Sequence, residues 1–289
     1  MKIYLNGKFL DKKDARISVF DHGFLYGDGA FEGIRAYDGL VFCLKEHIDR
    51  LYATMRALVL DPRMNKKKMS DAVVATLKAN KLKDGYVRLI VSRGDGDLGL
   101  DPRKCSGRPN VVMIADKITL YPAELYRNGM AIITVKTVKN RRDALDPRLK
   151  TLNYLNNILA KIEANDAGYA EAIMLDGDGH VGECTGDNIF IVKNGRLATP
   201  ARGCLLGITR QAILDIAAKS RIAASQRSIT LREVYKADEC FLTGTAAELI
   251  PVVKVDGRVI GSGRPGAMTL KLLKLFKQAT VNDGTRYAV

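Results

Sequence analysis

A short segment without regular periodicity divides the chain into two stretches that each mix strand and helix patterns. Residues 118–129, ITLYPAELYRNG, contain a proline and no sustained period. Domains usually run to about 100 to 200 residues, so a chain of 289 residues can hold two of them. The sequence predicts a mixed α/β (α+β) protein with a small α+β domain over 1–118, a connector over 119–129, and a larger domain of mixed β-structure with helices over 130–289.

The hydrophobic pattern predicts the elements of each domain. Alternation with period two indicates strands, and a repeat of three to four residues indicates helices. The predicted strand segments of the first domain are 2–9, 15–20, 31–42, 86–93 and 109–115, and its helices are 46–60 and 66–81. The predicted strands of the second domain are 130–138, 169–175, 188–200 and 238–244, and its helices are 150–166, 209–219 and 265–279. Asp38-Gly39 and Asn194-Gly195 predict tight hairpin turns.

Composition argues against several other classes of protein. No apolar run approaches the roughly 20 residues that span a bilayer, and the amino terminus lacks the apolar core of a signal peptide, so we expect a cytoplasmic protein without a membrane partner. The five cysteines are far apart and form no C-x-x-C pair, which favours reduced thiols. Three histidines, none at ligand spacing from another, predict no metal site.

The net charge of +14 raises nucleic acid as a partner. The basic residues are mostly scattered, however, and no aromatic residues are interleaved among them for base stacking. We therefore expect no nucleic-acid partner, although a basic nucleic-acid-binding protein stays the alternative from a different class.

A glycine pattern typical of dinucleotide binding occurs three times. G-x-G-x-x-G appears at 94–99, 177–182 and 261–266 in a chain with 26 glycines, so the pattern arises easily here. The dinucleotide motif needs a strand before it and a helix directly after it within a βαβ unit, and none of the three meets both conditions.

A lysine where an exposed turn gives way to a predicted helix carries more information. In DPRLKTLNYLNN, Lys150 and Tyr154 are four residues apart, so on a helix they share a face and can contact one ligand. The predicted helix over 151–163 would place Leu152, Leu155, Leu159 and Ile162 on one stripe in the core. Alone, such a lysine is usually a solvated charge.

Other segments supply the groups that a lysine carrying pyridoxal 5'-phosphate requires, namely a carboxylate, a phenol donor and a phosphate site. Glu183, in a Gly-rich turn, is the candidate carboxylate, or simply a turn acid. Thr209 begins a predicted helix whose N-H groups could bind phosphate, or is only its N-cap. Thr245 offers a hydroxyl in a turn after a strand. Arg50 could grip phosphate through two N-H groups, or be a surface arginine.

The ordered segments YGDGAFEGIRAY, EHIDRL, YVRL, DPRLKTLNYLNN, GECTGDNIF, GITR and GTAAE resemble the class IV aminotransferases, which are fold-type IV pyridoxal 5'-phosphate enzymes. Within that family the chain looks most like the branched-chain amino acid aminotransferases. The resemblance covers nearly the whole chain in the right order.

By this resemblance Lys150 is the Schiff-base lysine, Glu183 the partner of the pyridine nitrogen and Tyr154 the partner of the ring oxygen. The resemblance also implies the residues that hold the phosphate, which are Arg50, Ile208, Thr209 and Thr245. Tyr26, Phe31, Tyr86 and Arg88 would line the substrate site together with Thr245 and Ala246. Tyr86 and Arg88 are two apart on a predicted strand, so they face the same side.

The implied reaction is a ping-pong transamination between branched-chain L-amino acids and 2-oxoglutarate. The family also implies amino acid and 2-oxo acid substrates and a homodimer or higher homo-oligomer. The short step from Lys150 to Tyr154 is shared with D-amino acid aminotransferases, so that activity and an aminodeoxychorismate lyase stay open. Arg93-Gly94-Asp95 lacks the histidine that D-specific enzymes carry two residues after a carboxylate-binding arginine.

Overall fold

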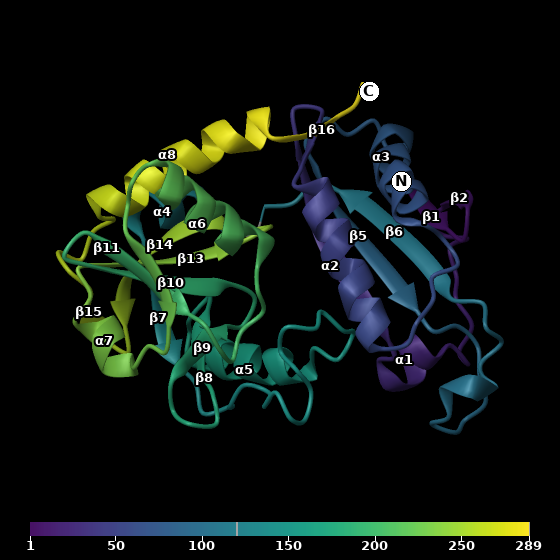
Figure 1. The fold of residues 1–289 in the computed structure, drawn as a ribbon, viewed down its shortest axis with the longest axis horizontal. Coiled ribbons are helices and arrows are strands. Elements are labelled where there is room, and N and C mark those ends of the chain that lie inside the picture. The colour runs from purple at the N-terminus through teal and green to yellow at the C-terminus, as the bar shows by residue number, and fades with distance from the viewer. Residues whose placement is uncertain (120, 289) are drawn as a thin grey trace. The chain divides into compact units, whose positions relative to one another are not determined.

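The computed structural model describes residues 1–119 and 121–288, and the chain divides into two compact units. The first comprises Met1–Ile118, Leu149–Asn153 and Thr280–Val289, and the second Thr119–Arg148 and Tyr154–Ala279. Each unit combines a sheet with helices (Figure 1), which confirms the predicted mixed α/β class. The predicted domain boundaries stay predictions, and Leu120 of the predicted connector and Val289 lie outside the described residues.

The first unit is built on an antiparallel seven-stranded sheet in the order β16-β4-β3-β5-β6-β1-β2. Its strands are β1 Lys2–Leu5, β2 Lys8–Asp11, β3 Gly29–Tyr37, β4 Leu40–Phe42, β5 Gly85–Ser92, β6 Asn110–Asp116 and β16 Gly284–Arg286. Its helices are α1 His22–Tyr26, α2 Leu44–Ala57 and α3 Lys66–Ala79, with a 3-10 turn at Pro102–Lys104.

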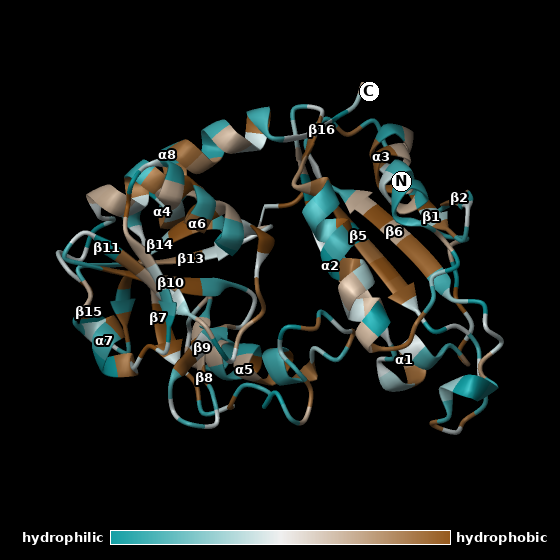
Figure 2. Cartoon of the chain, viewed as in Figure 1, coloured by the Kyte–Doolittle hydropathy of each residue, from teal (hydrophilic) through white to brown (hydrophobic). Residues whose placement is uncertain are grey.

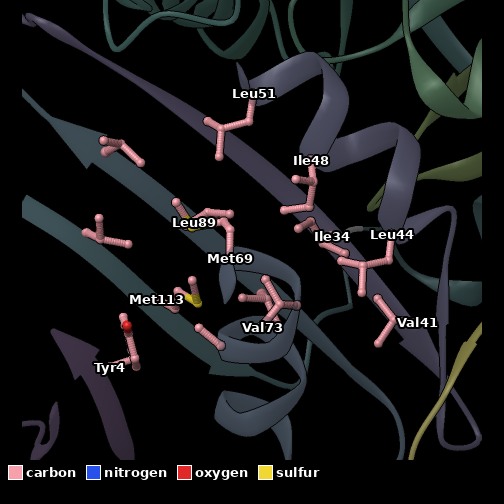
Figure 3. Packing of buried hydrophobic residues seen from close by; sticks show 14 of the residues in the cluster. Tyr4, Ile34, Val41, Leu44, Ile48, Leu51, Met69, Val73, Leu89 and Met113 are labelled. Atoms are coloured by element: carbon pink, nitrogen blue, oxygen red, sulfur yellow. The ribbon is translucent and has the colours of Figure 1, made fainter. Parts of the chain in front are cut away.

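Helices α2 and α3 pack on the sheet of the first unit and enclose its core (Figure 3). Ile48 and Leu51 of α2 and Val73 of α3 are fully buried, and they meet Leu89 of β5 and Met113 of β6. Figure 2 shows that most residues of β5 and β6 are hydrophobic. Because strand residues alternate between faces, the same strands present a second set of side chains away from this core.

The second unit contains a mixed nine-stranded sheet in the order β12-β11-β10-β13-β14-β7-β8-β9, with β15 paired to β14. Its strands are β7 Met130–Thr134, β8 Ala172–Leu175, β9 Val181–Cys184, β10 Asn188–Lys193, β11 Arg196–Pro200, β12 Ala224–Arg227, β13 Glu239–Gly244, β14 Glu248–Val255 and β15 Arg258–Val259. Its helices are α4 Ala123–Asn128, α5 Leu155–Asp166, α6 Ile208–Lys219 and α7 Leu231–Tyr235, and most of α8 Ala267–Asn282 belongs to it.

Both predicted hairpins form where the turn residues tolerate a left-handed backbone. Asp38 and Gly39 join β3 to β4 with φ of 41° and 75°, and Asn194 and Gly195 join β10 to β11 with φ of 48° and 70°. Positive φ at both central residues matches the twist of antiparallel strands. By contrast, the predicted strand over 15–20 is wrong: these residues alternate in sequence but form no strand and are largely exposed.

The helix predicted over 150–166 begins later than expected, and its predicted core stripe is wrong. Helix α5 starts at Leu155, and Leu155, Leu159 and Ile162 are 65%, 48% and 48% exposed. The buried face instead carries Ala160 and Ala164, because small side chains let α5 lie close to β8. The apolar side chains of Leu155, Leu159 and Ile162 therefore form an exposed stripe on α5.

The predicted connector is partly helical. Helix α4 lies within it, and the Tyr126 hydroxyl of this helix donates a hydrogen bond to the backbone oxygen of Ala247, 3.0 Å away. Among the described residues, no helix combines the length and apolar character that a membrane crossing requires.

Candidate active site

Lys150 is held against the amino-terminal end of β3 in the first unit. The backbone N-H of Phe31 donates to the Lys150 oxygen at 3.0 Å, and the N-H of Leu152 donates to the Gly29 oxygen at 2.9 Å. A Cβ on Gly29 would come within 2.7 Å of the Leu152 side chain, so glycine permits this close approach. The expectation that Lys150 lies on a helix with Tyr154 is therefore wrong, because strand-like pairing with β3 takes up residues 150–152.

The amine of Lys150 lies above an aromatic ring. Its Nζ is 4.3 Å from the centroid of Phe31, a distance typical of a cation-π contact. The backbone N-H of Lys150 also donates to Oγ1 of Thr54 on α2 at 3.3 Å. The lysine is thus anchored by its backbone, and its amine is placed by Phe31.

Phe31, Tyr86 and Arg88 come together on the first unit's sheet. The Arg88 guanidinium lies 4.8 Å from the ring centroid of Phe31 and 5.7 Å from that of Tyr86, and it donates to the Tyr86 hydroxyl at 3.3 Å. A Cβ on Gly33 would come within 2.0 Å of that hydroxyl, so the glycine of β3 makes room for it. The prediction that Tyr86 and Arg88 face the same side of the sheet is confirmed. The role of these residues in binding substrate stays a prediction.

Tyr26 has different neighbours from these three residues. It ends α1, where its ring meets His22 edge-on and its hydroxyl donates to the backbone oxygen of Leu98 at 2.5 Å. Its side chain is also partly exposed. Its predicted contact with substrate stays a prediction.

Arg50 reaches from α2 to a buried carboxylate on β3. Its Nε and Nη2 donate to the two oxygens of Glu32 at 2.7 and 2.8 Å, and the Nδ1 of His47 lies 2.8 Å from Glu32 as well. Burial would raise the pKa of Glu32, but the Arg50 guanidinium and the His47 ring outweigh it and lower that pKa to about 2. Arg50 is therefore half of a buried ion pair rather than a surface arginine, and the sequence analysis missed Glu32 and His47.

Glu183 lies in the second unit on strand β9, so its predicted position in a turn is wrong. Its Oε1 is 2.6 Å from Nζ of Lys139, and its Oε2 accepts from the backbone N-H of Leu205 at 2.8 Å and from Nδ2 of Asn188 at 3.3 Å. Lys139 also donates to Asn157 at 3.1 Å. The buried side chains of Glu183 and Lys139 therefore form an ion pair. The sequence analysis did not identify Lys139 as part of this site.

The start of α6 forms a crowded polar corner in the second unit. Gly207 caps the helix, Ile208 begins it and Thr209 is buried. A Cβ on Gly207 would come within 2.1 Å of Oδ1 of Asn188, so only glycine fits. Backbone N-H groups at a helix start lack partners within the helix and bind anions.

A hydroxyl without a partner lies on the strand beside Asn188. Thr243 of β13 is paired in register with Asn188, and its buried Oγ1 has no hydrogen-bond partner among the described residues. Thr245 and Ala246 follow in the turn between β13 and β14, and Tyr154 directly precedes α5. The predicted residues of the second unit therefore fall at the ends of β9 and β13 and at the starts of α5 and α6.

Comparisons with known proteins identify the family of this chain. The sequence model of the family described as amino-transferase class IV matches residues 29–255. A Methanocaldococcus jannaschii protein, provisionally named a branched-chain-amino-acid aminotransferase, is 53% identical over 99% of this chain and 99% of its own length. A Bacillus licheniformis D-alanine aminotransferase is 32% identical, with 98% of both chains covered.

Solved structures show the same fold. The branched-chain amino acid aminotransferase of Escherichia coli superposes with a TM-score of 0.94 at 31% identity, covering 99% of this chain and 97% of that one. The T.th. branched-chain amino acid aminotransferase complexed with N-(5'-phosphopyridoxyl)-L-glutamate gives 0.91 at 33% identity, covering 96% and 93%. The predicted fold-type IV architecture is confirmed, and the chain belongs to the class IV aminotransferases, enzymes that use pyridoxal 5'-phosphate.

Proposed function

We propose that this enzyme transfers the amino group between the branched-chain L-amino acids leucine, isoleucine and valine and 2-oxoglutarate. The observation that carries the proposal is the cluster of Phe31, Tyr86 and Arg88 on the sheet that also anchors Lys150. Aromatic rings suit an aliphatic side chain, whereas a guanidinium suits the distal carboxylate of glutamate. One wall with both properties can serve the two half-reactions.

The described residues fit pyridoxal 5'-phosphate. The start of α6, with Gly207 packed against Asn188 and the unpartnered hydroxyl of Thr243 close by in the sheet, offers N-H and O-H donors to a phosphate. Glu183 offers a buried carboxylate for the protonated ring nitrogen. The cofactor, when bound, supplies an aldehyde and an electron-withdrawing ring that take up the amino group.

Membership of the class IV aminotransferases suggests roles for the individual residues. We assign the phosphate to Arg50, Ile208, Thr209 and Thr245, the ring nitrogen to Glu183 and the ring oxygen to Tyr154. Lys150 would hold the cofactor through its side-chain amine, and the same amine, when free and neutral, would take up and hold the proton that leaves Cα of the substrate. Thr245 and Ala246 offer a hydroxyl and backbone groups for the substrate carboxylate, and Tyr26 adds an aromatic side chain to the pocket.

A D-amino acid transferase is the second candidate, favoured by the similarity to a D-alanine aminotransferase. In that case Arg93 would have to bind a substrate carboxylate. Here its Nε and Nη2 donate to Asp28 at 2.8 and 2.9 Å, and its Nη1 and Nη2 donate to the backbone oxygens of Val59 and Leu58. A guanidinium engaged in this way favours the L-specific reaction.

We further propose a homodimer or larger homo-oligomer in the cytoplasm. The exposed stripe on α5, formed by Leu155, Ile158, Leu159 and Ile162, is the kind of apolar surface that a second subunit covers. All five cysteines are free thiols, as expected in a reducing compartment.

The first experiment is a visible absorption spectrum of the purified protein before and after L-leucine, without any 2-oxo acid. We expect the yellow band of the aldehyde form of the cofactor to give way to the amine form. Conversion by D-alanine but not L-leucine would favour the second candidate. A protein that stays colourless with added pyridoxal 5'-phosphate would contradict both.

Lys150→Ala is expected to abolish turnover, because no other group is assigned to the proton transfer. General base catalysis contributes about 10²- to 10⁴-fold, and loss of the covalent step adds to this. Activity is measured with L-leucine and 2-oxoglutarate, with Lys136→Ala as control, since that lysine is exposed. Turnover by Lys150→Ala at the rate of the control would remove the central assignment.

A further inference from the structure

The arginine assigned to the phosphate belongs to a group of three ionisable side chains, and the other two are buried beneath it. Glu32 is completely buried on β3, and His47 and Arg50 reach it from the same face of α2, three residues apart. The Glu32 and His47 side chains are 0% and 2% exposed, whereas that of Arg50 is 13% exposed. The arginine is therefore the only member of this group that reaches the surface of the unit to any extent.

The contact between Glu32 and Arg50 fixes the plane of the guanidinium. Two parallel N-H···O bonds from Nε and Nη2 define both the position and the tilt of the group, which a single contact would not do. The remaining N-H groups lie in the same plane, so their directions are fixed as well.

His47 supports the carboxylate without adding a competing positive charge. Burial lowers the pKa of His47 more than the adjacent Glu32 raises it, and the charges of Arg50 and Lys150 lower it further. The ring is therefore neutral at neutral pH, and its N-H to Glu32 completes the bonds to the carboxylate. The group carries one negative and one positive charge.

We propose that Glu32 and His47 are positioning residues that hold Arg50 in the orientation needed to bind the cofactor phosphate. This rests on the proposed function, which assigns the phosphate to Arg50. Binding by a preoriented arginine avoids the loss of side-chain entropy that a mobile arginine would suffer on binding.

The test compares the affinity of the full-length protein, freed of cofactor, for pyridoxal 5'-phosphate and for pyridoxal. Both compounds carry the aldehyde and the ring. The affinity for pyridoxal 5'-phosphate divided by the affinity for pyridoxal therefore measures the contribution of the phosphate. In Glu32→Gln, which keeps the shape but removes the charge, we expect this ratio to fall about 10- to 100-fold. Glu46→Gln, an exposed position on α2, is the matched control and should keep the wild-type ratio.

A merely structural role would lower both affinities together and leave the ratio unchanged, which would overturn the proposal. Glu32→Asp, which keeps the charge but is one methylene shorter, guards against a misfolded Glu32→Gln and should give an intermediate ratio. If Arg50→Lys lowers the ratio while both Glu32 variants keep it, the inference is wrong and the assignment of Arg50 stands. If Arg50→Lys also keeps the wild-type ratio, the assignment of Arg50 and this inference fall together.

Discussion

Two buried carboxyl groups, Glu32 in the first unit and Asp187 in the second, have opposite electrostatic surroundings. Glu32 faces a guanidinium and an imidazole, and its pKa falls to about 2. Burial and the neighbouring carboxylate of Glu171 raise the pKa of Asp187 well above its usual value, although the Tyr121 hydroxyl donates to Asp187 at 3.2 Å. Burial alone therefore does not decide whether a carboxyl is charged, since the sign of the nearest charge does.

The difference fits the chemistry assigned to the two regions. An ionised Glu32 orients a cation that we assign to the phosphate. In the second unit, Glu171 accepts hydrogen bonds from the N-H of Ala172 at the start of β8 and from those of Thr185 and Gly186 just after β9. A proton on Asp187 limits repulsion between the two carboxyls.

The largest effect expected from this comparison follows from removing the compensating cation. Arg50→Met leaves Glu32 buried without its main partner, and we expect a loss of about 3 to 5 kcal/mol in the free energy of unfolding. The measurement is urea denaturation of the cofactor-free protein at pH 7. Adding Glu32→Gln to Arg50→Met should recover part of the loss, and a double variant as unstable as the single one would contradict this account of Glu32.

A somewhat smaller effect is expected on the acid side. The pKa of Glu32 falls from 4.5 to about 2 on folding, so its ionised form stabilises the protein at pH above 4.5, and this contribution is lost as the pH falls toward 2. A fall of that size corresponds to about 3 kcal/mol. The free energy of unfolding of Glu32→Gln should therefore change less between pH 5 and pH 3 than that of wild type, and parallel pH profiles would argue against an ionised Glu32.

An effect of opposite sign is expected for Asp187. Burial and Glu171 raise its pKa on folding, so the stability contributed by its neutral form is fully present at pH below the unfolded pKa of 3.8 and is lost as the pH rises through the folded pKa. Asp187→Asn keeps an acceptor for Tyr121 but cannot ionise, so we expect its free energy of unfolding at pH 8 to be above that of wild type. Little difference is expected at pH 4, and an equal effect at both pH values would point to packing instead of charge.

The sequence predicts well the elements whose pattern is local. Both hairpins form at their Asn-Gly and Asp-Gly turns, and α2, α3 and α6 lie close to their expected positions. The glycines around Glu183 predict a turn, but pairing with β8 makes the segment a strand. The periodicity after Lys150 predicts a helix, but residues 150–152 pair instead with β3, more than a hundred residues earlier in the chain.

Residues of the site that act through others left weaker signals. Glu32 is a charged residue in an otherwise apolar strand, GAFEGIRAY, and this contrast could have marked it as paired. The sequence does not single out Lys139, because it lies among other basic residues. Its contact with Glu183 depends on the pairing of β8 with β9, which brings Glu183 beside it. The spacing of Leu155, Leu159 and Ile162 correctly predicts an apolar stripe on one face of a helix. The sequence places this stripe in the core, whereas the structure leaves it exposed.

The pairing of residues 150–152 with β3 also bears on the order in which the protein can mature. During synthesis the first 118 residues can collapse on α2 and α3, but Phe31 and Gly29 find these backbone partners only after residues 150–152 have emerged. Contacts so distant in sequence form late, since the loop must close first. Cofactor added to a growing chain would therefore meet Arg50 before it could meet a correctly placed Lys150.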